Sequence, residues 1–268
     1  MDFGSRLGRA MVWGTGGLVA VVLSMAGYTL VAGGGDGDRG QPRRPGASHT
    51  APGGGQDTGP QPTYAAPQEW SEPQRWASLP RGAQVDQHGN EVTFPHTEQG
   101  AVAMLTAVQT TAAEGDHSLA DEQMSIYASY MSRADRSRAS EAKVRQAAYQ
   151  ADARLRQSLG APAEGALPHG AYMRTAAVGF QIIESSPDEI WAYVLNRVTT
   201  KASQTATEDS AYSRTLMAAR WDNGDWKLSA TATARAAQHT QEHTPPKMAA
   251  PGDTTFNTAG WTAIREAS

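Results

Sequence analysis

Apolar residues are distributed unevenly along this chain of 268 residues. Residues 11–32, MVWGTGGLVAVVLSMAGYTLVA, carry no charge and are long enough to cross a hydrocarbon core of ~30 Å as a helix. Residues 33–69 are rich in Gly and Pro and hold almost no large apolar side chain, so they cannot contribute to a core. The pattern predicts a cytoplasmic N-terminus at 1–10, a transmembrane helix at 11–32, a disordered tether at 33–69, an extracytoplasmic domain at 70–236 and a polar, partly ordered C-terminal tail at 237–268.

The charges beside the apolar segment predict its orientation. Arg6 and Arg9 precede the segment, whereas Asp36 and Asp38 follow it, and positively charged flanks stay in the cytoplasm. We therefore expect a single-pass protein of the cell membrane whose C-terminal domain lies outside the cytoplasm. A cleaved signal peptide is the alternative, although its apolar region is normally only about 7–15 residues long.

Small residues recur every four positions within the apolar segment, at Gly16, Ala20 and Ser24. This spacing lets two membrane helices approach each other closely, so one interpretation is a homo-oligomer. The other interpretation is that small residues are common in any membrane helix of this composition.

Three segments between residues 97 and 160 repeat their apolar residues with the period of a helix. The first begins at the predicted N-cap Thr97 and ends at Gly115, the second begins at Ser118, and the third runs from about Ser140 to Leu159. Their apolar stripes predict the core of the domain. The main residues of these stripes are Ala101, Met104, Leu105, Val108, Leu119, Met124, Tyr127, Tyr130, Met131, Val144, Ala148, Ala151, Leu155 and Leu159.

The period changes to two after residue 170, which is typical of strands. Four strands are predicted, at 171–184, 188–202, 211–221 and 226–236. Asn223-Gly224 joins the last two, and this dipeptide favours a tight hairpin because both positions accept a positive φ. We interpret Asp222 and Asp225 as solvent-exposed flanks of this turn rather than as a catalytic carboxylate pair.

Trp70 and Trp76 follow the tether directly. Because exposed tryptophans on a tether would be costly, we expect both side chains to pack onto the edge of the domain.

Composition and motifs offer little chemistry. The chain has no cysteine, which excludes disulfides and cysteine-based zinc sites, and its net charge of −4 does not favour direct nucleic-acid binding. The stretch HTQEH matches a zinc-hydrolase pattern with His239 and His243 as ligands and Glu242 as base, but little chain follows to supply a third ligand. SEAK, at Ser140, lacks the partner motifs of the S-x-x-K enzymes, so Ser140 is interpreted as a helix cap. We therefore assign no catalytic, cofactor-binding or metal-binding residue, and we expect neither a cofactor nor an enzyme.

Three short stretches carry a resemblance to a known family: LPRG at 79–82, PHTEQGAVAML at 95–105 and RWDNGDWKL at 220–228. With the predicted order of elements over residues 70–236, they resemble the NTF2-like extracytoplasmic domains of the VirB8 and TcpC class, assembly components of conjugative secretion systems. The chain is more closely similar to a family of actinobacterial single-pass membrane proteins, a domain of unknown function often encoded on integrative conjugative elements. The resemblance implies an α+β fold of about three helices packed on a curved four-stranded antiparallel sheet, and it carries no catalytic residue.

These observations lead us to expect a membrane-anchored extracytoplasmic scaffold or interaction protein, a component of a conjugative DNA-transfer apparatus. Its expected partners are the membrane, other proteins of the cell envelope and further copies of itself. The alternative is a small-ligand-binding module, because an NTF2-like sheet curls into a cone. Phe180, Trp191, Tyr193 and Met217 would line that cone around a ligand, or would fill it as core.

Overall fold

The computed structural model describes residues 70–265, which form an α+β fold around one seven-stranded sheet. The predicted membrane helix at 11–32 and tether at 33–69 lie outside the described residues. None of the helices within residues 70–265 has the length and apolarity needed to span a membrane.

The three long strands of the sheet are those that the period-two pattern predicted. β5, β6 and β7 pair antiparallel along most of their length, so that Val194 lies between Phe180 and Thr215. The sheet order is β1-β9-β5-β6-β7-β8, with β4 also paired to β5, and only β1 and β9 are parallel. β2 and β3 form a separate hairpin. The strands are β1 Trp76–Ser78, β2 Gln84–Val85, β3 Glu91–Val92, β4 Thr111–Glu114, β5 Tyr172–Ser185, β6 Glu189–Lys201, β7 Asp209–Asp222, β8 Asp225–Leu228 and β9 Thr262–Arg265.

The prediction of a four-stranded sheet is wrong in number. The additional strands β1, β4 and β9 are only three or four residues long. An alternation of period two cannot be recognised over so few residues. β4 also explains why the first helix ends at Gln109 rather than at Gly115, because the chain turns there to pair with β5.

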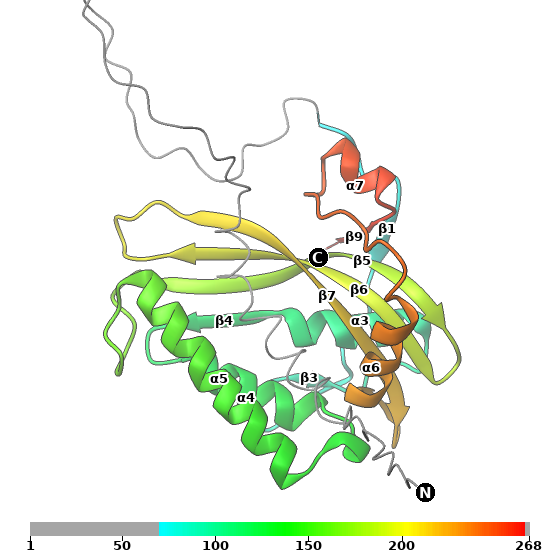
Figure 1. Cartoon of the computed structure of the whole chain (residues 1–268), viewed down its shortest axis with the longest axis horizontal. Coiled ribbons are helices and arrows are strands. Elements are labelled where there is room, and N and C mark those ends of the chain that lie inside the picture. Colours follow the sequence, from blue (N-terminus) through cyan, green and yellow to red (C-terminus); the bar gives the residue numbers. More distant parts are fainter. Residues whose placement is uncertain (1–69, 266–268) are drawn as a thin grey trace, which may run out of the picture.

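Three helices cover one face of the sheet, as predicted (Figure 1). α3 (Glu98–Gln109) and α4 (Leu119–Tyr130) have the predicted N-caps, since the side chains of Thr97 and Ser118 accept hydrogen bonds from backbone amides of the first turn. Their apolar stripes join β6 and β7 in a cluster that includes the fully buried Met104.

The third helix, α5 (Arg138–Leu159), begins earlier than predicted. Its N-cap is Ser137, and Ser140 is the third helical residue. Each serine side chain accepts a hydrogen bond from the other's backbone N–H, which makes a capping box. The prediction of Ser140 as the cap is therefore wrong by three positions.

The segment predicted as the fourth strand is mostly a helix. β8 ends at Leu228, and Ser229 caps α6 (Ala230–His239) by accepting a hydrogen bond from Ala232 N. The alternation ATATARA imitates a strand, but alanine is the strongest helix former. Ala232 and Ala236, four residues apart, are both fully buried against the sheet.

The face of the sheet opposite α3–α5 is covered by α6, by α7 (Thr254–Thr258) and by the segment that joins them (Figure 1). Trp191 packs against α6, whereas Tyr193 and Leu195 pack against the fully buried Phe256 and Trp261. The packed part of the chain thus continues to Arg265, beyond the boundary at 236 that we expected.

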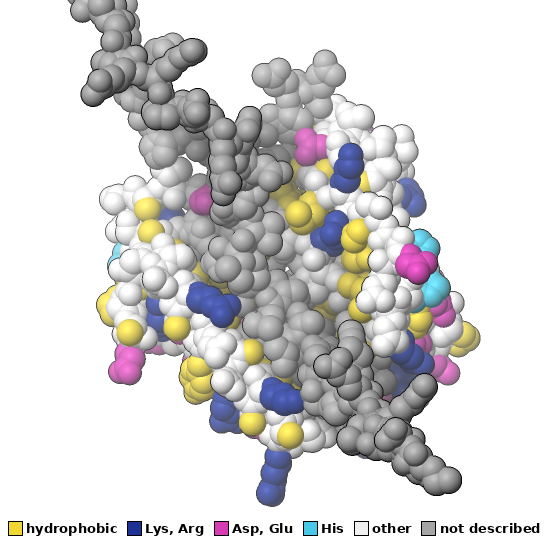
Figure 2. Space-filling view, viewed as in Figure 1, with side chains coloured by type: hydrophobic (Ala, Val, Ile, Leu, Met, Phe, Trp, Pro, Cys, Tyr) yellow, Lys and Arg dark blue, Asp and Glu magenta, His cyan; other side chains and the backbone are white. Residues whose placement is uncertain are grey.

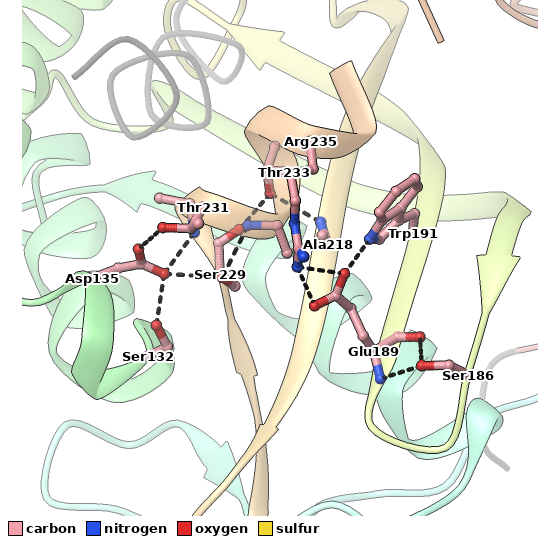
Figure 3. A network of polar contacts seen from close by, with 12 residues as sticks. Ser132, Asp135, Ser186, Glu189, Trp191, Ala218, Ser229, Thr231, Thr233 and Arg235 are labelled. Atoms are coloured by element: carbon pink, nitrogen blue, oxygen red, sulfur yellow. Dashed lines mark hydrogen bonds and ion pairs between the residues drawn. The ribbon is translucent and has the colours of Figure 1, made fainter. Parts of the chain in front are cut away.

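The N-terminal end of α6 is fastened by a single carboxylate (Figure 3). Asp135, at the end of the short 3-10 helix Arg133–Asp135, accepts hydrogen bonds from the hydroxyls of Ser132, Ser229 and Thr231 and from Ala230 N, at 2.6–3.0 Å. A negative charge at a helix N-terminus is favourable. Burial alone would raise the pKa of Asp135, but the hydrogen bonds from Thr231, Ser132 and Ser229 outweigh it and lower this pKa below its usual value.

The middle of α6 is held by an ion pair at Arg235 (Figure 3). Arg235 donates from Nη2 to both carboxylate oxygens of Glu189, at 2.8 and 2.6 Å. The indole Nε1 of Trp191 donates to the same carboxylate at 2.8 Å. Glu189 therefore links β6, α6 and the largest side chain beneath α6.

Trp70 and Trp76 pack less completely than predicted. Their exposed fractions are 64% and 38%. The ring of Trp70 lies over Gly252, where a Cβ would come within 2.3 Å of the ring, and the guanidinium of Arg265 lies 5.2 Å from the ring centre of Trp76. Both rings therefore contact the domain through one side and face solvent with the other.

Candidate functional site

A pocket of about 320 Å3 opens between α3 and the β2–β3 hairpin, and we call it the α3 pocket. One wall is formed by Ala103, Thr106, Ala107 and Thr110, which share one side of α3 because they are three or four residues apart. These side chains are small, so the helix leaves room beside it. The apolar stripe predicted from the sequence lies on another side of α3 and packs on the sheet.

The β2–β3 hairpin forms the second wall and is tied to α4. Asp86 accepts hydrogen bonds from the backbone N–H groups of His88 and Asn90 at the turn. The side-chain amide of Asn90 donates to Ser125 Oγ and to Ser129 Oγ, each at 2.8 Å. These contacts fix the segment Gly89–Glu91 above the pocket.

The floor and the third wall come from Phe94, Tyr130, Leu79 and Pro80. Tyr130 donates its hydroxyl hydrogen to Glu91 O at 2.9 Å, which connects the floor to the hairpin. Gly82, in the same LPRG stretch as Leu79, approaches the backbone of β3 so closely that a Cβ would lie 2.6 Å from Val92 O. Only glycine fits there.

The hairpin RWDNGDWKL supports this region from the side. Asp225 accepts a hydrogen bond from Phe94 N at 2.8 Å, and Trp226 Nε1 donates to Pro95 O at 2.9 Å. Asn223 and Gly224 have φ values of 53° and 85°, so the tight turn is confirmed. Asp225 is only 8% exposed and pairs with Lys227, so our placement of this carboxylate in solvent is wrong. It acts as a structural acceptor for the first residues before α3.

His96 stacks on the same hairpin. Its ring lies 3.9 Å from that of Trp221 at an interplanar angle of 9°. Nε2 of His96 donates to Asp188 Oδ1 and Pro187 O, both at 2.9 Å. The histidine thus fastens the β5–β6 turn to the β7–β8 hairpin. The three stretches LPRG, PHTEQGAVAML and RWDNGDWKL, far apart in sequence, meet around one end of the α3 pocket.

Several carboxylates act on the phenol of Tyr130, which lines the pocket. Burial, followed by the charges of Asp86, Glu91 and Asp225, raises the pKa of Tyr130 well above its usual range, so the phenol stays protonated. Burial alone would raise the pKa of Asp86, but hydrogen bonds from Ser129 and from the backbone of Asn90 and His88 lower it. Asp86 therefore remains ionised beside the hairpin.

The HTQEH stretch does not form a convergent set of ligands. His239 is the last residue of α6, and its ring stacks on that of His243 at 5.9 Å and 17°. The nitrogen lone pairs lie in the ring planes, so stacked rings do not direct them at one point. Histidine side chains and an acidic one gather at the surface near α6 (Figure 2). Within residues 70–265, no group of three or more His, Asp or Glu side chains is arranged to hold a metal ion.

The residues proposed to line a cone do not share a cavity. Phe180, Trp191, Tyr193 and Met217 are all at most 9% exposed. Met217 faces α3–α5, whereas Trp191 and Tyr193 face α6 and the C-terminal segment on the opposite side of the sheet. The pocket residues Asn90, Glu91 and Tyr130 were missed as a site. The turn sequence DQHGN before β3 was the only signal for the hairpin that carries two of them.

No family model, curated protein or solved structure matches this chain. The interpretation of the α3 pocket therefore rests on its geometry.

Proposed function

We propose that the chain is a membrane-anchored interaction protein of the cell envelope, with an NTF2-like domain outside the cytoplasm. On the resemblance described above, we place it in a conjugative DNA-transfer apparatus. The observation that carries the proposal is the pair of exposed tryptophans at the beginning of the domain, next to an edge strand. Trp70 and Trp76 keep exposed fractions of 64% and 38% although both faces of the sheet are packed.

Tryptophan is enriched at the centre of protein interfaces because it offers a large apolar area and one donor. Trp76 belongs to β1, which is at the edge of the sheet and pairs with β9 on one side only. An edge strand with an exposed aromatic side chain can accept a partner strand. The predicted tether before residue 70 would supply the reach for such contacts.

Two measurements in intact cells test this function. A single cysteine at Ser48 should react with a membrane-impermeant thiol reagent, since the chain has no other cysteine. A photo-crosslinking residue at Trp76 should capture one defined envelope protein, whereas the same residue at Tyr149, 63% exposed on α5, should not. Labelling only after lysis would contradict the predicted topology, and equal crosslinking from both positions would contradict the interface.

A small-ligand-binding module is the second candidate. The α3 pocket supports it, because its volume of about 320 Å3 falls at the lower end of the range of about 300–1,000 Å3 found for ligand sites. The predicted membrane stripe Gly16, Ala20 and Ser24 lies outside the described residues, and self-association through it stays a prediction.

A further inference from the structure

The hydroxyl groups in the helical wall of the α3 pocket have already used their hydrogens. Thr106 Oγ1 donates to Ala103 O at 2.8 Å, and Thr110 Oγ1 donates to Thr106 O at 3.0 Å. A hydroxyl has one hydrogen and two lone pairs. Both side chains are therefore left with acceptor capacity only.

The side-chain amide of Asn90 has also used its hydrogens. Its two hydrogens are taken by Ser125 Oγ and Ser129 Oγ. Because both amide hydrogens are used in these two contacts, the amide oxygen is the part of the group that remains for a ligand.

Tyr130 and Glu91 are the other polar residues that line the pocket. The Tyr130 hydrogen is used by Glu91 O. The Glu91 carboxylate accepts one hydrogen bond, from Gly82 N to Oε2 at 3.2 Å, and forms no ion pair with any Lys, Arg or His in residues 70–265. The pocket thus combines one carboxylate that has no cationic partner in this part of the chain with several neutral acceptors.

The remaining lining has no polar side chain and consists of Leu79, Pro80, Gly89, Phe94, Ala103 and Ala107. An anion would meet a carboxylate and lone pairs there, and a bare metal ion would meet apolar walls instead of several charged ligands. A cation with several N–H donors on a short hydrocarbon stem can pair with the carboxylate and the neutral acceptors, while its stem packs against the apolar walls.

We propose that the α3 pocket binds a small organic cation, an ammonium or guanidinium group on a short apolar stem, with Glu91 as its counter-ion. The stem lies against the alanine side of α3, and the cationic group donates to Glu91, Asn90 and the threonine oxygens. This site does not depend on the interaction function proposed above, because Trp70 and Trp76 take no part in it.

The test uses the purified full-length chain and ligand-observed saturation-transfer NMR. The probes are n-butylammonium, n-butylguanidinium and the neutral n-butanol. We expect both cations to bind saturably and n-butanol to bind at least about tenfold more weakly, since a hydrogen bond between charged groups is stronger than one that a neutral hydroxyl makes. Equal binding of n-butanol, or no saturable binding of either cation, would overturn the proposal.

Two variants locate the binding. Glu91→Gln keeps an oxygen for Gly82 N and should weaken cation binding at least about tenfold, while Glu184→Gln, an exposed carboxylate of β5, makes the same change of charge and should have no effect. Ala107→Leu should fill the pocket and abolish binding of all three probes. Unchanged affinity in Glu91→Gln would assign the cation to another site.

A fourth probe, N-acetyl-lysine methylamide, distinguishes a lysine side chain of a protein partner from a free small amine. Binding at least tenfold tighter than that of n-butylammonium would identify a lysine side chain of a protein partner as the ligand. Equal or weaker binding would identify a free small amine. Both outcomes keep the pocket as a cation site.

Discussion

Both faces of the sheet are buried, but the side chains that the covering helices contribute differ in size between the two faces. On the face toward α3–α5, the helices bring large aliphatic side chains such as Met104 and Leu105, and the strands also bring large side chains such as Trp226. On the other face, the strands bring Trp191 and Tyr193, and α6 brings only alanines. A helix of small residues can approach a sheet closely when the strands contribute the large side chains.

The two covers also differ in how they are fastened. α3–α5 are joined to the sheet mainly through one broad apolar cluster. α6 has ten residues and a narrow apolar side, and it depends on Asp135 at its N-terminal end and on the ion pair of Arg235 with Glu189 at its middle (Figure 3). We therefore expect substitutions of polar residues to lower the free energy of unfolding more on the α6 face. Truncations of core side chains should lower it by about the same amount on both faces.

The largest expected effect comes from Trp261→Ala. Trp261 is fully buried on the α6 face and donates from Nε1 to Lys247 O at 2.7 Å. Its loss should reduce the free energy of unfolding by about 3–5 kcal/mol, as should Trp226→Ala on the opposite face. Urea denaturation of both variants measures this. A loss below about 1 kcal/mol for Trp261→Ala alone would mean that the C-terminal cover is dispensable.

Asp135→Ala should follow, with a loss of about 2–3 kcal/mol, because four donors lose a charged acceptor. The pKa of Asp135 is lowered in the folded state, so its contribution is present above the unfolded value near 3.8 and is lost as pH falls through the lower folded pKa. In Asp135→Asn, the free energy of unfolding should therefore fall less steeply below about pH 5. Identical slopes in wild type and variant would contradict this role.

The sequence predicted the long elements well because their signals are local. β5, β6 and β7 and the starts of α3 and α4 follow from period and caps, and the alternation along β6 already placed Trp191 and Ile190 on opposite faces. An apolar residue on both faces of a strand indicates that both faces are covered. The cover of the second face could not be assigned, since the alternation of ATATARA also fits a strand, and the burial of Ala232 and Ala236 against the sheet is visible only in the structure.

The α3 pocket could not be predicted for a related reason. Its acceptor character depends on which partner takes each hydrogen of Asn90, Thr106 and Tyr130, and these partners are distant in sequence or belong to the helix backbone. The same holds for Asp225, which is an exposed turn residue by sequence and a buried acceptor of Phe94 N in the structure. Local patterns identify a turn, but they do not show what the turn contacts.

The two aspartates of the β7–β8 turn make a matched pair for the next test. Asp225→Ala should lower the free energy of unfolding by about 1–2 kcal/mol, because Phe94 N would be left buried without an acceptor. Asp222→Ala should stay within about 0.5 kcal/mol, since its contact with Arg133 N is exposed to water. Thermal or urea unfolding compares the two. Equal losses would show that the turn itself, and not the contact with Phe94, sets the effect.

Arg235→Ala should have a smaller effect than Asp135→Ala or Asp225→Ala, and it shows how much each of the two polar contacts of α6 contributes to stability. The Arg235 side chain is 54% exposed, so water already screens its ion pair with Glu189, and the loss should be about 0.2–1 kcal/mol. Glu189 keeps its hydrogen bond from Trp191 Nε1 in this variant, so the indole should stay in place. Urea denaturation at low and high salt, with Arg197→Ala on the outer part of β6 as a control, measures the difference. If Arg235→Ala costs as much as Asp135→Ala, the ion pair rather than the capped N-terminus holds α6 on the sheet.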